Sequence, residues 1–263
     1  MNSERIPDKT PTNTVDFACH CGNHATPSAL DVNAAPHDNA ASVARRGFLR
    51  IAITGTVAGA IAGAMAPPPA AMAALTTPDA ALKAMMDGNE RYVGGQLKSF
   101  NEDLSILKAK TAEKQEPFAA VLSCADSRVP VELVFDQSIG HLFVVRVAGN
   151  ISTPEIIASL EYGVAVLGAK AIMVLGHGNC GAVKATIEGK AVPGHISALY
   201  APIRPAVDAA GSNLDAAINA NAKMQAGLLS TASPIIAGAI KEGKLKVVPA
   251  RYDLASGKVS LLT

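Results

Sequence analysis

The sequence of 263 residues has no tryptophan, and aromatic residues make up only 4% of it. Charged residues are also scarce, at 17%, and the formal net charge is +1. This balance gives no sign of a surface for nucleic acid or another charged polymer, so we expect no nucleic-acid partner. Alanine and glycine dominate the apolar composition, which favours closely packed helices. The length is sufficient for one sizeable hydrophobic core.

Cysteine is rare as well, which excludes a scaffold built on disulfides in a chain of this length. The four cysteines are Cys19, Cys21, Cys124 and Cys180. The first pair lies in a polar segment, whereas each member of the second pair follows an apolar run and has polar neighbours. This division favours metal binding or catalysis for Cys124 and Cys180.

Residues 1–44 have no apolar periodicity, and we expect them to be disordered. Two arginines then precede an uncharged stretch, 51–66, of only 16 residues, and a membrane-spanning helix needs about 20. Small residues follow, and 71–73 fits a cleavage site. The arginine pair resembles a twin-arginine export signal. We therefore predict that residues 1–73 form a disordered leader, read by the twin-arginine (Tat) export machinery, and that the protein is periplasmic or otherwise exported. An uncleaved signal would leave it anchored to the membrane.

The leader also contains Cys19, His20, Cys21 and His24, which could form a metal cluster. Their spacing matches no familiar zinc module, and the segment has no core to hold the ligands. We therefore favour the interpretation that these residues belong to a discarded leader.

The remaining chain, residues 74–263, alternates apolar runs with segments of helical periodicity, and no repeat is present. We expect a first helix from Thr77, with Gly88 and Gly94 interrupting or ending it. Further helices are expected over 153–169, 195–209, 213–231 and 233–242, and strands over 118–124, 141–149, 171–180, 244–254 and 258–262. This order predicts one α/β domain with a mainly parallel sheet flanked by helices and an antiparallel edge strand.

Polar side chains follow two of the predicted strands. Cys124, Asp126 and Arg128 follow the first strand, and His177 and Cys180 follow the third. The carboxyl ends of parallel strands meet at one edge of a sheet, so these residues can lie together. Two thiolates and one imidazole form a ligand set that zinc prefers. Cys180 precedes a helix start, which favours its thiolate form.

Asp126 has two possible roles in such a site. It could be a fourth ligand and close the site, or it could pair with Arg128 and leave a coordination position for water. A carboxylate held by arginine stays ionised and accepts a hydrogen bond. Beside zinc-bound hydroxide it would orient the attacking oxygen, because zinc lowers the pKa of its water to about 7. The second role explains why Arg128 lies two residues away.

The motifs "CADSRVP" and "LGHGNCGAV", together with "GNERYVGG", "FVVRVAGN", "SLEYGVAVLG" and "YDLASGKVSLL", resemble those of the β-class carbonic anhydrases. The likeness covers nearly all of residues 74–263. It implies zinc held by Cys124, His177 and Cys180, an Asp126–Arg128 pair, and reversible hydration of carbon dioxide to bicarbonate and a proton. It also implies a homodimer or a higher homo-oligomer with the site at the subunit boundary.

The resemblance further implies a substrate pocket. Gln115 matches a glutamine that contacts substrate across the dimer, and Phe143 and Ala148 match residues that line an apolar pocket for carbon dioxide. Gly181, next to Cys180, is placed with these substrate-binding residues. An uncharged substrate of low polarity suits an apolar pocket.

Some members of the family are switched off by bicarbonate in a second pocket that uses a tryptophan three residues before the first cysteine. Val121 stands there in this chain, so we expect the open site, with Asp126 a fourth ligand only in a closed form. Three alternatives remain: a structural zinc closed by Asp126, a Cys124 nucleophile paired with His177, and hydrolysis of carbonyl sulfide or carbon disulfide by the same ligands. His195 could shuttle protons, although a surface or packing role is favoured.

Overall fold

The computed structural model describes residues 75–99 and 104–263. The predicted leader, residues 1–73, and with it Cys19 and Cys21, lies outside the described residues. In the part of the chain that is described, no helix is both long enough and apolar enough to cross a membrane.

A five-stranded sheet forms the centre of the described region, in the order β2-β1-β3-β4-β5. Its strands are β1 (Ala119–Ser123), β2 (Leu142–Arg146), β3 (Ala171–His177), β4 (Lys246–Tyr252) and β5 (Val259–Leu261). The first four strands are parallel, and β5 pairs antiparallel with β4 at the edge. The predicted fold class and the antiparallel edge strand are therefore confirmed. Every residue of β1 and β3 is buried, as expected for central strands of a parallel sheet.

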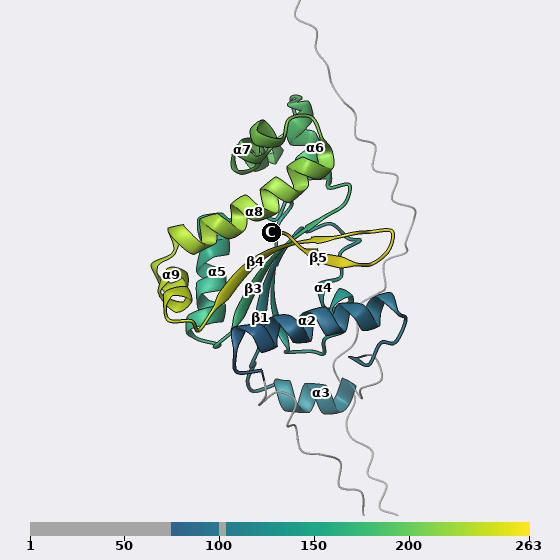
Figure 1. The fold of residues 1–263 in the computed structure, drawn as a ribbon, viewed down its shortest axis with the longest axis vertical. Helices are drawn as coiled ribbons and strands as arrows, with labels where there is room; N and C mark the ends of the chain where they lie inside the picture. Colours follow the sequence, from purple (N-terminus) through teal and green to yellow (C-terminus); the bar gives the residue numbers. More distant parts are fainter. Residues whose placement is uncertain (1–74, 100–103) are drawn as a thin grey trace, which may run out of the picture. The chain divides into compact units, whose positions relative to one another are not determined.

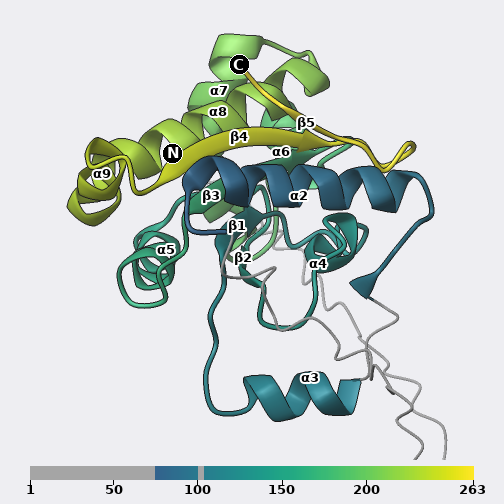
Figure 2. The ribbon, with the colours of Figure 1, turned by 60° about the horizontal axis from the view of Figure 1, so that its bottom comes forward.

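Helices cover both faces of this sheet (Figures 1 and 2). In chain order they are α2 (Pro78–Val93), α3 (Leu104–Thr111), α4 (Val131–Val134), α5 (Pro154–Ala165), α6 (Gly181–Glu188), the 3-10 helix η2 (Ile196–Leu199), α7 (Tyr200–Ala210), α8 (Leu214–Ala232) and α9 (Pro234–Lys241). In Figure 2, β4, which is the neighbour of the edge strand β5, lies between α2 and α8. The predicted segment 195–209 is divided into η2 and α7. The sequence did not predict α3 and α4.

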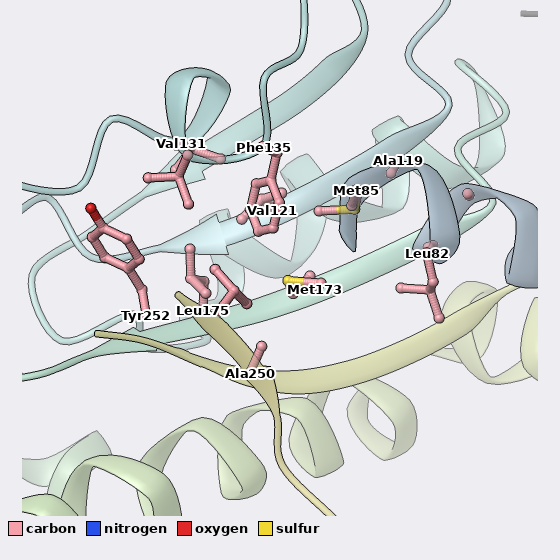
Figure 3. Close-up of a cluster of buried hydrophobic side chains, with 14 of the residues drawn as sticks. Leu82, Met85, Ala119, Val121, Val131, Phe135, Met173, Leu175, Ala250 and Tyr252 are labelled. Carbon is pink, nitrogen blue, oxygen red and sulfur yellow. The ribbon is translucent and has the colours of Figure 1, made fainter. Parts of the chain in front are cut away.

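The two faces of the sheet carry separate apolar clusters because successive strand residues point to opposite sides. Val121 and Met173 face the cluster formed with α2 and α4, which Figure 3 shows together with Met85 and Phe135. Leu122 and Val174 face the opposite cluster, to which α5, α8 and α9 contribute. The structure is therefore a three-layered sandwich with the sheet in the middle.

Helix α2 begins where the sequence predicted, because the Thr77 side chain accepts a hydrogen bond from the backbone N–H of Ala80 at 3.2 Å. Gly88, however, does not interrupt the helix. It lies buried inside α2, where an added Cβ would be 1.8 Å from the carbonyl oxygen of Phe135. Glycine is therefore required by the close approach of α2 to the end of α4.

Candidate metal centre

The parallel pairing of β1 with β3 brings the predicted site together. Ser123, the last residue of β1, pairs with Leu175, and β3 ends two residues later at His177. Cys124 directly follows β1. The turn after β3 includes Asn179 in the left-handed region, with φ of 53°, and returns the chain to Cys180 at the N-cap of α6. Cys124, His177 and Cys180 therefore meet at the carboxyl ends of neighbouring strands.

The three side chains each offer one ligand atom, and these atoms all lie within 4.8 Å of one another. All three residues are buried, with exposed fractions of 4% for Cys124, 0% for His177 and 1% for Cys180. Nδ1 of His177 donates to the carbonyl oxygen of Gly178 at 2.9 Å, which leaves Nε2 with its lone pair free. Within the described residues, this buried Nε2 has no hydrogen-bond partner.

A buried nitrogen without a partner is costly unless it binds something. Metal-ligating histidines commonly donate their other ring nitrogen to a backbone carbonyl, as His177 does here. Together with two sulfur atoms, this nitrogen forms a donor set that fits zinc. The residues present therefore fit the metal that the sequence predicted.

The two thiols share their protons unequally. The contact with the Cys180 thiol lowers the pKa of Cys124 to about 4 against the opposing effect of burial, and the Gly149 N–H lowers it further. The same contact raises the pKa of Cys180, and burial adds to the effect. The first-turn amides of α6 do lower the pKa of Cys180, as its position before a helix predicted, but the contact with Cys124 outweighs them. Without a metal, the contact between the two thiols therefore favours the thiolate form of Cys124 over that of Cys180.

Asp126 and Arg128 form the ion pair that the sequence predicted. Arg128 donates from its backbone N–H and from Nε to Oδ1, both at 2.9 Å, and from Nη2 to Oδ2 at 2.7 Å. The Arg128 side chain thereby holds the pKa of the Asp126 carboxyl well below its usual range. Oδ2 also lies 3.8 Å from Nε2 of His177. An ionised carboxylate therefore stands at the margin of the ligand cluster and is restrained by arginine.

Two further groups support Cys124, and the sequence had assigned neither of them to it. Arg146, at the end of β2, donates to the carbonyl oxygens of Cys124 at 3.0 Å and Asp126 at 2.6 Å. The backbone N–H of Gly149 donates to Sγ of Cys124 at 3.3 Å. A signal for Arg146 was its position at the end of an edge strand, where a charged residue follows four apolar ones.

The predicted substrate-binding residues, unlike the three ligand residues, do not all lie together at the carboxyl ends of the strands. Gln115 is exposed and precedes β1, whereas the ligands follow the strands, so one chain does not bring Gln115 to the site. Phe143 lies on the edge strand β2, half-buried, with its ring centroid 6.2 Å from that of Tyr162. Ala148 and Gly181 are next in the chain to Gly149 and Cys180, and so adjoin the ligand cluster.

The other sequence candidates lie elsewhere. Val121 is fully buried in the apolar cluster on the α2 side of the sheet. His195 is exposed at the start of η2. His141 precedes β2, and its Nδ1 lies 3.3 Å from Oε1 of Gln137, which fits a structural role.

A parallel sheet that carries two thiols and an imidazole at the carboxyl ends of its strands is a metalloenzyme arrangement of the α/β class. The model of the family described as "Carbonic anhydrase" matches residues 119–259. The chain belongs to this family, and its sequence motifs and fold place it among the β-class carbonic anhydrases.

Curated relatives and solved structures agree with this assignment. "Carbonic anhydrase" of Mycolicibacterium smegmatis is 36% identical over 194 residues, which covers 71% of this chain and 94% of the relative. "Carbonic anhydrase 2" of Mycobacterium tuberculosis is 34% identical and covers 71% and 93%. The structure of the Coccomyxa β-carbonic anhydrase in complex with acetazolamide has a TM-score of 0.54 and 31% identity, covering 60% of this chain and 77% of that one. A tetrameric β-carbonic anhydrase from Sordaria macrospora shares the fold, with a TM-score of 0.53, 24% identity and coverage of 60% and 90%.

Proposed function

We propose that this chain catalyses the reversible hydration of carbon dioxide to bicarbonate and a proton, at a zinc ion held by Cys124, His177 and Cys180. The observation that carries the proposal is the buried, unpartnered Nε2 of His177, within the cluster of two sulfurs and 3.8 Å from the Asp126 carboxylate. Zinc in such a site lowers the pKa of a coordinated water to about 7 and so supplies a nucleophile at neutral pH.

The role of Asp126 follows from its hydrogen bonds. Both of its carboxylate oxygens accept from Arg128, yet an ionised carboxylate has further lone pairs to offer. It can therefore accept one more hydrogen bond beside His177 and orient the attacking oxygen toward the carbon atom of the substrate. The three contacts from Arg128 support the open form of the site, in which Asp126 is restrained and is not a fourth ligand.

Carbon dioxide has no net charge, and Ala148 and the half-buried Phe143 offer apolar surface for it. Gln115 precedes β1 and can take part only if a second copy of the chain supplies it. We therefore include in the proposal a homodimer or a larger homo-oligomer, in which one subunit completes the pocket of the other. The name of the Sordaria relative, which describes a tetramer, supports this. Sedimentation of the wild-type chain tests it, and a monomer with full activity would contradict it.

Export through the twin-arginine pathway is also part of the proposal, supported by the arginine pair and the short apolar stretch in residues 45–66. Replacement of both arginines by lysine should retain the full-length chain in the cytoplasm of a host with this pathway. Cell fractionation with activity assays would show this, and export that continued unchanged would contradict it.

Stopped-flow hydration of carbon dioxide by the zinc-loaded protein, between about pH 6.5 and about pH 9, tests the central proposal. Strong activity near pH 7 would support the open site. Activity confined to the alkaline end would mean that Asp126 closes the site at rest. Absence of hydration with zinc bound would favour carbonyl sulfide or carbon disulfide as substrate, which the same assay can examine, or a structural metal.

Cys180→Ser tests the ligand assignment separately. A serine hydroxyl is a poor zinc ligand at neutral pH, so the variant should lose its metal, and added zinc should no longer raise its Tm. Zinc content by elemental analysis and a thermal scan would measure both. A variant that kept one zinc per chain would contradict the assignment.

A further inference from the structure

A buried polar pair on helix α8 has no part in the site as described so far. Asn221 and Gln225 are each 1% exposed and stand four residues apart, on the face of α8 that otherwise buries Ala217, Ile218, Ala222 and Leu229. Residues with this spacing lie on one side of a helix. Polar side chains in such an apolar stripe are costly unless each polar atom is satisfied. Their hydrogen bonds therefore indicate what they are for.

Those hydrogen bonds go to the loop that follows β2. Nδ2 of Asn221 donates to the carbonyl oxygen of Gly149 at 2.8 Å. Oε1 of Gln225 accepts from the backbone N–H of Ser152 at 2.8 Å. Helix α8 thus holds the loop at two points, residues 149 and 152.

Gln225 also fixes Asn221 itself. Nε2 of Gln225 donates to Oδ1 of Asn221 at 3.2 Å and to the carbonyl oxygen of Pro202, in α7, at 3.0 Å. The amide of Asn221 is therefore oriented with its nitrogen toward Gly149. A rotation of that amide would break the hydrogen bonds at both of its ends.

The loop has a defined conformation at Gly149. The N–H of Asn150 donates to the carbonyl oxygen of Val147 at 2.9 Å, and Gly149 has φ of 77°. Ala148 is not among the residues with positive φ, so this is a type II turn with Gly149 in its third position. An added Cβ on Gly149 would lie 2.6 Å from Cδ1 of Ile203, so this glycine is also confined sterically.

The other backbone group of Gly149 points at the metal centre. Its N–H donates to Sγ of Cys124 at 3.3 Å, while its carbonyl oxygen is held by Asn221. A hydrogen bond to a thiolate favours the charged sulfur and reduces the electron density that the sulfur gives to a metal. The orientation of this one residue therefore affects the ligand properties of Cys124.

We propose that Asn221 and Gln225 are positioning residues of the metal centre, which hold Gly149 so that its N–H donates to the sulfur of Cys124. Neither side chain touches a ligand atom, and both act through the turn. The inference rests on the proposed function in one respect, namely that Cys124 binds the metal.

Asn221→Leu tests this, because leucine has the same γ-branched shape, suits the apolar stripe and removes the donor to Gly149. Three measurements apply. Hydrogen exchange of the Gly149 amide, followed by NMR in the metal-free protein, should become at least about tenfold faster. In the cobalt-substituted protein, the sulfur-to-cobalt charge-transfer band should move to longer wavelength, because the sulfur has lost a hydrogen bond. Zinc affinity, measured by competition with a chelator, should fall about tenfold or more.

Leu229→Ala is the matched control. Leu229 is fully buried on the same helix and packs in the apolar cluster that contains Leu122 and Val174, but its side chain has no hydrogen-bonding atom, so its truncation lowers stability without removing a donor to Gly149. We expect a lower Tm with an unchanged charge-transfer band. Equal spectral shifts in Leu229→Ala and Asn221→Leu would overturn the inference, because general destabilisation would then explain both. Unchanged exchange, band and affinity in Asn221→Leu would overturn it as well.

Gln225→Met provides the test if Asn221→Leu does not fold, since methionine keeps the length of the side chain. It leaves the donor of Asn221 in place but releases its orientation, and a smaller shift in the same direction is expected; no shift would contradict the inference. A wild-type chain that bound neither zinc nor cobalt would contradict the proposed metal centre instead. The exchange of the Gly149 amide in the metal-free protein would still decide whether Asn221 positions the turn.

Discussion

Oδ2 of Asp126 lies 3.8 Å from Nε2 of His177 and at the same time accepts a 2.7 Å hydrogen bond from Nη2 of Arg128. The carboxylate is therefore close enough to the ligand cluster to interact with whatever His177 binds, and it is also held by the guanidinium of Arg128. In the proposed mechanism, this relationship would separate the residues that hold the metal from the residue that orients a reactant.

Asp126→Ala should keep its zinc and lose most of its activity. The ligand atoms of Cys124, His177 and Cys180 are untouched by this change, whereas the only carboxylate at the cluster margin among the described residues is removed. Loss of a group that handles a proton in the transition state costs about a hundredfold or more in rate. Stopped-flow kinetics and elemental analysis would measure the two effects. Asp87→Ala, which removes a carboxylate paired with Lys83 on the surface of α2, is the control and should behave as wild type. Loss of zinc together with activity in Asp126→Ala would instead make Asp126 a ligand.

Arg128→Met should destabilise the fold at neutral pH but not in acid. Arg128 keeps the pKa of Asp126 below its ordinary value in the folded chain, so the pair adds stability above the ordinary pKa. That stability is lost progressively as the pH falls from about 4, where the carboxylate of the unfolded chain takes up a proton, to the lower pKa of the folded chain. Because Arg128 is half exposed, solvent screens the pair and the effect is small. Urea unfolding at neutral pH and in acid would show a difference between variant and wild type that shrinks with falling pH. A difference that was constant with pH would contradict this account.

Metal uptake near pH 7 should release about one proton from the thiols. The pKa of Cys124 is lowered to about 4, so this thiol is already ionised, whereas the raised pKa of Cys180 keeps its proton in place. Only Cys180 therefore has a proton to give when both sulfurs become ligands. Titration of metal-free protein with zinc in weakly buffered indicator would count the protons. Zinc-bound water, with a pKa of about 7, adds to this count, so the titration is repeated at about pH 6, where that water stays protonated. A release of about two protons there would mean that both thiols are protonated before binding.

Gly88→Ala and Gly227→Ala should change stability in opposite directions. Both glycines lie inside helices, where alanine is intrinsically better by about 1 kcal/mol. At Gly88 the new methyl group would collide with the backbone of Phe135, and overpacking of this kind costs about 1–3 kcal/mol or more. At Gly227 no atom lies within 4 Å of the added Cβ, so only the helix preference remains. Chemical denaturation of the two variants would compare them. A stabilised Gly88→Ala chain would contradict the close contact between α2 and α4.

The sequence was sufficient to predict the sheet and the ligands because both have local signals. The strands that carry Cys124 and His177 are apolar runs that end at polar residues, and such runs can be recognised without tertiary information. Helix α4 has only four residues, too few for a helical period, and its start at Pro130 has no side-chain cap, so it depends on the burial of Val131 and Val134.

Other parts of the site depend on contacts between distant segments. The hydrogen bond from Asn221 to Gly149 joins residues that are 72 positions apart, and no local sequence pattern predicts it. Gln115 and the ligands lie at opposite ends of β1, and only a second chain could reconcile that separation with the role that the family resemblance implies. Contacts of this kind between distant residues can be identified only when the positions of the strands are known.

The pairing of β1 with β3 also sets an order of events during folding. Cys124 and His177 are 53 residues apart in the chain, and they meet only when these two strands lie side by side. Contacts of such long range form late, because the loop between them must first be closed. A metal ion can therefore be captured tightly only by a chain whose central sheet is already assembled. The rate of metal capture during refolding would consequently report the rate at which the central sheet is completed.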